Sequence, residues 1–232
     1  MIISGGTFHS LQTHAKEEED PKVTEAIKSP WVLSPVKGRV EQPKADMLGL
    51  RHDTGLGVIS KLSFAAPQNQ AIVHRAWGLL RNTDADYGPS FQYNEYESVG
   101  STFGGILHMF SATIMGAILG SPFLLGLLTM VMPAPGSGPD ISKTEQSPIR
   151  IEAVAIPDDD KAPKVRSVFA FPSSSYHTTG LFLGEAAASL LYNRSLEGGL
   201  KGGCLTPAFL GEDLLTRLRA GGATITVEVE KQ

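Results

Sequence analysis

The first group of residues suited to catalysis lies in the segment 90–98, whose sequence has the alternating pattern of a β-strand. Successive side chains of a strand point to opposite faces, so Tyr93, Glu95 and Glu97 would share one face. If that face is covered by helices, a buried carboxylate there could act as a general acid or base, or hydrogen-bond a substrate carbonyl. The alternative is that these three side chains form a solvated face.

A second candidate is His108, which lies inside a long apolar segment. An uncharged donor in an apolar pocket can polarise a group of a bound ligand, which makes His108 a better functional candidate than the other histidines. The alternative is a core histidine hydrogen-bonded to the backbone.

Tyr176 and His177 follow a Pro-Ser-Ser-Ser turn, at the expected start of a helix. There they would present donors near a helix N-terminus, where negative charge is favoured. Capping by Ser174 or Ser175 explains the same residues equally well. The expected catalytic residues are His108, Tyr176 and Glu97, and the expected substrate contacts are Thr7, Tyr93, Phe103, Met109, Met115 and His177.

Metal and common hydrolytic chemistry have no support in the sequence. There is no Ser-His-Asp spacing, H-E-x-x-H, phosphate-binding loop or paired-cysteine motif. His9 and His14 are five residues apart, which places them about 140° apart around a helix rather than on one face. No metal and no cofactor are therefore expected.

The composition limits the partners and the compartment. The 232 residues carry 20 Lys+Arg and 24 Asp+Glu, a net charge of −4 without a basic stripe, so nucleic acid is not an expected partner. The single cysteine, Cys204, fits a reducing compartment. The N-terminus lacks the pattern of a signal peptide, so we expect a cytoplasmic protein, with contact to a membrane or lipid left open.

The expected elements give an α+β domain that spans residues 1–232. A mixed, largely antiparallel sheet of about five strands should have helices packed on one face, and residues 30–57, rich in Pro and Gly, should be irregular. The expected helices are 7–19, 67–81, 178–192 and 207–220, and the expected strands are 58–64, 90–96, 149–156, 165–171 and 224–230.

The segment 100–132 is expected to be helical and hydrophobic, because no Asp, Glu, Lys or Arg occurs between Glu97 and Asp140. It is long enough to span a bilayer. A buried or surface-lying helix pair broken at Gly120-Ser121-Pro122 is favoured over a span, because Gly and Pro interrupt the run and His108 lies within it.

Several short motifs resemble the saccharopine dehydrogenase-like oxidoreductases. The tail Gly202-Gly203-Cys204-Leu205-Thr206-Pro207 resembles the end of that family, Val73-His74-Arg75 resembles its V-V-x-R helix, and Tyr176-His177-Thr178-Thr179 resembles its Y-x-A-T helix start. The resemblance implies the family's C-terminal substrate and dimerisation domain, which is compatible with a homodimer. The family's G-x-G-x-x-G nucleotide-binding half has no counterpart in this sequence.

The branch of the family that is resembled includes trans-acting enoyl reductases of polyketide and lipid assembly, which implies a hydrophobic small-molecule substrate. Without the nucleotide-binding half, we expect a cofactor-independent cyclase or isomerase, such as a Diels–Alder type pericyclase, that works by shape preorganisation and hydrogen bonding. One alternative is a non-catalytic protein that binds a hydrophobic ligand or a lipid surface. A partner subunit of a related reductase and a fragment of a mis-split gene are two others.

Overall fold

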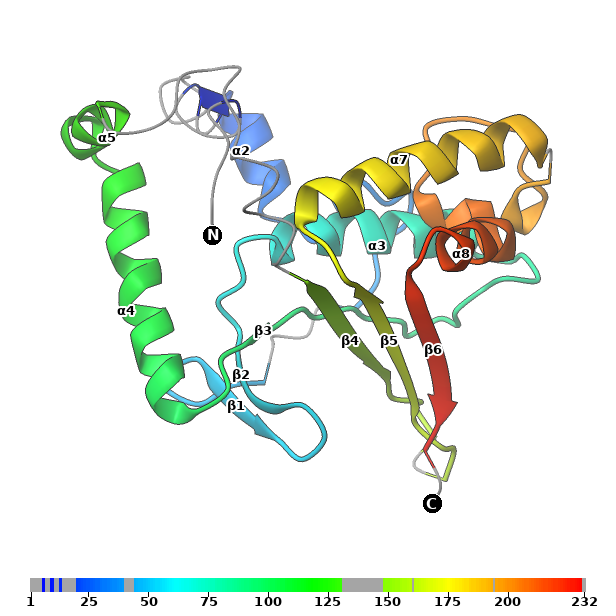
Figure 1. Ribbon diagram of the computed structural model, residues 1–232, viewed down its shortest axis with the longest axis horizontal. Helices are drawn as coiled ribbons and strands as arrows, with labels where there is room; N and C mark the ends of the chain where they lie inside the picture. Colours follow the sequence, from blue (N-terminus) through cyan, green and yellow to red (C-terminus); the bar gives the residue numbers. More distant parts are fainter. Residues whose placement is uncertain are drawn as a thin grey trace. The chain divides into compact units, whose positions relative to one another are not determined.

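The computed structural model describes residues 6, 9, 10, 13, 20–39, 44–130, 148–159, 161–193 and 195–230. The α+β class expected from the sequence is confirmed, with helices and two antiparallel sheets of three strands each (Figure 1). The chain forms two compact units. The first comprises Met1–Leu33, Val40–Ala71 and Gln92–Asp140, and the second comprises Ser34–Arg39, Ile72–Phe91 and Ile141–Gln232.

The sheet of the first unit is small and antiparallel. Its strands are β1 (Leu50–Asp53), β2 (Gly57–Ser60) and β3 (Glu97–Ser98), in that order across the sheet. Arg51 pairs with Ile59, and Ile59 pairs with Ser98. Helix α2 (Pro21–Ile27) belongs to the same unit and is capped by the Asp20 carboxylate, which accepts a hydrogen bond from the Lys22 N–H.

The uncharged segment forms two helices, α4 (Thr102–Leu119) and α5 (Pro122–Thr129), with the break at Gly120 and Ser121 where the sequence places it. Ser101 and Ser121 cap the two helices. Only 6% of the residues in the apolar window of α4 are buried, so the helix lies at the surface. Its length and composition would allow it to cross a membrane. Its first turns touch the sheet, because Gly105 lies against the buried side chain of Leu50.

The second unit is built on the sheet β4 (Ile149–Ala155), β5 (Val165–Phe171) and β6 (Thr224–Val229). Helices α7 (Ser175–Tyr192) and α8 (Gly211–Ala220) lie at the end of this sheet where β5 finishes and β6 begins (Figure 1). Phe169, Phe171 and Ile225 pack there against the buried leucines of α8. The sheet face opposite these side chains is polar, with Glu152 paired to Arg150 and Arg166. The short 3₁₀ helices η1 (Glu197–Gly199) and η2 (Pro207–Leu210) precede α8.

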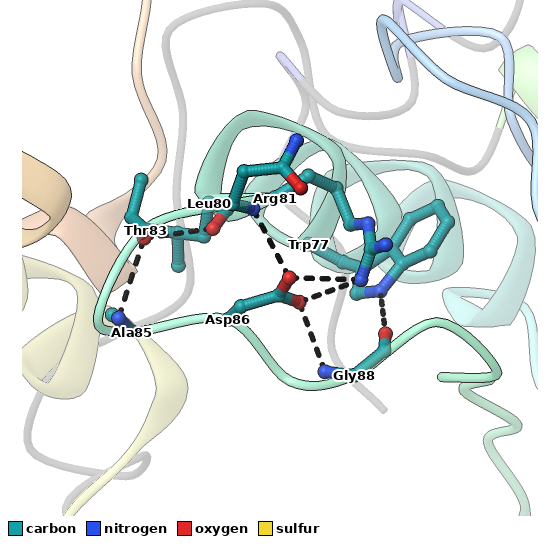
Figure 2. Close-up of polar contacts among 8 residues, drawn as sticks. Trp77, Leu80, Arg81, Thr83, Ala85, Asp86 and Gly88 are labelled. Carbon is teal, nitrogen blue, oxygen red and sulfur yellow. Dashed lines mark hydrogen bonds and ion pairs between the residues drawn. The ribbon is translucent and has the colours of Figure 1, made fainter.

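Helix α3 (Ala66–Leu80) contributes residues to both units and ends in a tightly bonded loop. The Asp86 carboxylate accepts hydrogen bonds from the Arg81 guanidinium and the Gly88 N–H, as Figure 2 shows. It also accepts one from the backbone N–H of Asn82. Trp77 Nε1 donates to the Gly88 carbonyl at 2.8 Å. The Asn82 N–H, followed by the bonds from Gly88 and Arg81, lowers the pKa of Asp86 against the opposing effect of desolvation.

The strand arrangement differs from the expected single sheet of about five strands. The segment 90–96 is not a strand, because β2 has only four residues and offers only Ile59 and Ser60 to β3. Strand β1 lies in the region 30–57 expected to be irregular. It pairs with β2 because the Asp53 carboxylate accepts from the Gly55 and Leu56 N–H groups and closes the turn.

Two expected helices also differ from the structure. The expected helix 207–220 is divided into η2 and α8, with Gly211 at a φ of 55° where the second begins. Most of the expected helix 7–19, including Thr7, lies outside the described residues.

Candidate functional site

A polar cluster around the Glu95 carboxylate is the best-defined candidate site of the first unit. Ser63 Oγ donates to Oε1 at 3.0 Å, and Asn69 Nδ2 and the Tyr93 hydroxyl donate to Oε2 at 2.8 and 3.0 Å. The donors come from the loop after β2, the first turn of α3 and the segment before β3. Gln70 Nε2 also donates to the Tyr93 carbonyl at 2.8 Å, so both the backbone and the hydroxyl of this tyrosine are fixed.

Tyr93 is the group in this cluster with a clearly altered acidity. Burial raises the pKa of its phenol well above the ordinary value, and the negative charge of Glu95 and the hydrogen bond to it act in the same direction. The hydroxyl therefore stays protonated across the physiological range. It is a neutral hydrogen-bond donor and not a base.

His108 is tied to the backbone beside this cluster. Its Nε2 lies 2.7 Å from the carbonyl oxygen of Leu62, the residue before Ser63. The partner is the backbone, as in the alternative of a core histidine, but His108 is half-buried and does not lie in the core. Since a carbonyl oxygen only accepts hydrogen bonds, the contact requires the proton on Nε2 and leaves Nδ1 as the nitrogen that a ligand could meet in the neutral ring.

The other expected residues of the first unit lie nearby in sequence but differ in exposure. Glu97 is exposed in β3, so it does not join Tyr93 and Glu95 in the cluster. Phe103 is 76% exposed and Met115 is 43% exposed, whereas Met109 is half-buried. Met115 is seven residues after His108 and therefore lies on the same face of α4.

Tyr176 and His177 belong to the second unit, at the start of α7. Ser174 caps the helix through the His177 N–H, as the capping alternative predicted. His177 Nδ1 lies 2.6 Å from Ser173 Oγ, and Tyr176 is 42% exposed. Each unit therefore has its own set of candidate residues.

The sequence did not indicate three of the side chains that hold the cluster, namely Ser63, Asn69 and Gln70. Asn69 and Gln70 lie 26 and 23 residues before their partners, on a helix where polar side chains are ordinary. No spacing rule connects such positions. The alternation of Tyr93 and Glu95 was the one available signal, and the two side chains do meet, although not within a strand.

Two of the motifs that carry the family resemblance are in contact in the second unit. Arg75 donates from Nε and Nη2 to the carbonyl oxygen of Cys204, at 3.0 and 2.6 Å. Arg75 lies on α3, and Cys204 lies in the glycine-rich tail. Two N–H groups of one arginine therefore hold a single carbonyl oxygen of the tail loop against the helix.

The described part of the chain fits neither a metal nor a dinucleotide. Within it, no three His, Cys, Asp or Glu side chains are grouped to hold a metal ion. A dinucleotide site needs a parallel strand followed by a glycine-rich turn and a helix. Both sheets that the structure describes are antiparallel. Gly198 and Gly199 belong to η1, and Gly202 and Gly203 lie in the loop between η1 and η2.

Comparison with known proteins relates the chain to redox enzymes. It is 30% identical, over 96% of its length, to proteins named trans-acting enoyl reductase in two strains of Mycobacterium tuberculosis. It is also 30% identical, over 69% of its length, to a trans-acting enoyl reductase of Mycobacterium ulcerans. No protein-family model and no solved structure matches the chain.

The chain is thus a relative of proteins named trans-acting enoyl reductases, and it spans 56% of the Mycobacterium tuberculosis proteins and 39% of the Mycobacterium ulcerans protein. The expected function, a cofactor-independent cyclase or isomerase of the Diels–Alder type, is wrong, because an enoyl reductase catalyses a redox reaction. The error came from treating the missing nucleotide-binding motif as evidence against redox chemistry.

Proposed function

We propose that this chain provides the acyl-substrate side of an enoyl reductase, as the substrate domain of a saccharopine dehydrogenase-like oxidoreductase. The observation that carries the proposal is the 30% identity to trans-acting enoyl reductases over 96% of the chain. The motif resemblance points in the same direction, and Arg75 and Cys204, from two of the motifs, are in direct contact.

The Tyr93 hydroxyl is the proposed donor to the substrate carbonyl. Reduction of a double bond conjugated to a carbonyl develops negative charge on the carbonyl oxygen, and a neutral donor placed there lowers the barrier. The raised pKa keeps the Tyr93 phenol protonated for this task. When its hydroxyl turns to substrate, Ser63 and Asn69 still hold the Glu95 carboxylate.

The apolar part of the substrate is proposed to contact the first turns of α4. Phe103 offers exposed apolar surface there, and Met109 adjoins His108. These contacts would suit a hydrophobic acyl chain. Roles for His108, Met115, Tyr176, Glu97 and His177 remain predictions, and Tyr93 has the strongest geometric support among the expected residues.

The reducing cofactor would be supplied by a nucleotide-binding domain outside the described residues. The antiparallel sheets described above do not form a dinucleotide site, and the curated relatives extend well beyond the portion that this chain matches. That domain could be part of a longer chain or of a separate polypeptide. In either arrangement, the present chain binds and orients the acyl group.

Calorimetric titration of the purified chain with a medium-chain 2-enoyl thioester tests this proposal. We expect saturable binding, weakened about tenfold in Tyr93→Phe because one hydrogen bond is lost. Tyr87→Phe is the matched control, since Tyr87 is also partly buried, with a raised pKa, but belongs to the second unit. The absence of saturable binding by the folded wild-type chain would contradict the proposal.

A further inference from the structure

The end of α4 and helix α5 carry exposed apolar side chains outside the residues proposed to contact substrate, although Leu125 of α5 is buried. Phe110 is 62% exposed, Ile114 45%, Phe123 74%, Leu127 50% and Met130 81%. Only 6% of the apolar window of α4 is buried, so the helix is exposed around most of its circumference. A helix that is hydrophobic on all sides is normally enclosed by protein or by lipid.

We propose that the part of α4 after Met109, together with α5, inserts into one leaflet of a lipid bilayer. The segment is compatible with the hydrocarbon interior of a bilayer, because no Asp, Glu, Lys or Arg occurs between Glu97 and Asp140. The nearest charged residues in the sequence on both sides are acidic, so no basic residue of this segment attracts anionic headgroups. Burial of apolar side chains drives the insertion.

Polar side chains on α4 already have partners within the protein. Ser111 Oγ donates to the His108 carbonyl at 2.8 Å, and Thr113 Oγ1 donates to the Met109 carbonyl at 2.9 Å. Such back-bonding lets a helix enter hydrocarbon without an unsatisfied hydroxyl donor. A protein interface would make the same demand, but it normally has a polar rim, and the lack of any charged residue between Glu97 and Asp140 therefore favours lipid over a second protein surface.

The depth of insertion is limited by contacts of α4 with the rest of its unit. Gly105 lies against Leu50, and His108 is bonded to the Leu62 carbonyl, so the first two turns stay with the sheet. The ten residues that follow Met109 in α4 extend about 15 Å. That length matches half of a hydrocarbon core of about 30 Å, and it is too short for a span.

Flotation with sealed vesicles of pure phosphatidylcholine tests the proposal on the whole chain. We expect the wild type to float with the vesicles, equally well at low and high salt and without gain from added anionic lipid. Phe110→Asp combined with Phe123→Asp should reduce the floating fraction at least tenfold. Met47→Asp, at a fully exposed apolar residue of the same unit outside these helices, should float like the wild type.

Circular dichroism and the thermal unfolding midpoint confirm that each variant is folded before flotation. Failure of the folded wild type to float would overturn the proposal, as would binding that requires anionic lipid or is lost at high salt. So would a wild-type dimer that ignores vesicles and dissociates in the double variant, because the surface would then be covered by a second copy. An equal loss of flotation in Met47→Asp would also contradict the proposal.

Discussion

At the scale of single residues, part-buried carboxylates accept several hydrogen bonds each and so connect separate segments of the chain. Glu95 accepts from Ser63, Asn69 and Tyr93, and the three donors come from segments that are separate in sequence. A part-buried carboxylate is costly unless such bonds compensate for the lost water. The sequence could indicate that Tyr93 and Glu95 share a face, but it could not identify the other two donors, Ser63 and Asn69.

Tyr93→Phe should change how stability depends on pH. The pKa of Tyr93 is raised, so the folded protein holds the phenol proton more tightly than the unfolded chain does. The resulting stability is complete below the ordinary value of 10.0 and is lost as the pH rises toward the folded value. We expect the wild type to lose more unfolding free energy above pH 10.0 than Tyr93→Phe does, as measured by urea unfolding. Identical slopes would contradict this assignment.

Asp86→Asn should destabilise the loop after α3 in the opposite pH range. The pKa of Asp86 is lowered, chiefly by the Asn82 N–H, so its contribution is present above the ordinary value of 3.8 and is lost as the pH falls through the folded value. The variant should be less stable than the wild type at neutral pH and equal to it in strong acid, by urea unfolding. Asp84→Asn, an exposed neighbour, is the control, and an equal loss there would refute the role of Asp86.

At the scale of elements, short-range sequence patterns located several helices and strands, but they did not show which strands pair with each other. The break between α4 and α5 coincides with the Gly-Ser-Pro interruption, and strands β4 and β5 follow two alternating runs. The three-residue turn that pairs β1 with β2 depends on Asp53, and it lay in a region that lacked any periodic signal. Sheet membership depends on long-range contacts, which explains why one expected sheet is two in the structure.

Two glycines of α4 should respond in opposite ways to alanine. A Cβ at Gly105 would lie 2.6 Å from a methyl group of Leu50, which is only 1% exposed and has no room to move. Gly105→Ala should therefore cost about 1–3 kcal/mol of unfolding free energy. At Gly116 nothing lies within 4 Å, so Gly116→Ala should stabilise by up to about 1 kcal/mol. Chemical denaturation measures both, and a neutral Gly105→Ala would show that α4 does not dock on β1.

At the scale of the whole molecule, the division into two units separates the candidate groups. Tyr93, Glu95 and His108 belong to the first unit, whereas Tyr176 and His177 belong to the second. The α+β class followed from the mixture of helical and alternating segments. The proposed reductase role did not follow from that mixture, because it rests on the motif resemblance and on the comparison with the longer enoyl reductases.

The most direct measurement uses a chimera in which this chain replaces the matching portion of the Mycobacterium tuberculosis relative. We expect the chimera to oxidise a reduced nicotinamide cofactor only when a 2-enoyl thioester is present. The rate should fall about tenfold or more in Tyr93→Phe, because one donor to the developing negative charge is lost. A folded chimera that binds the cofactor but shows no enoyl-dependent oxidation, while the parent relative does, would contradict the proposed role of this chain.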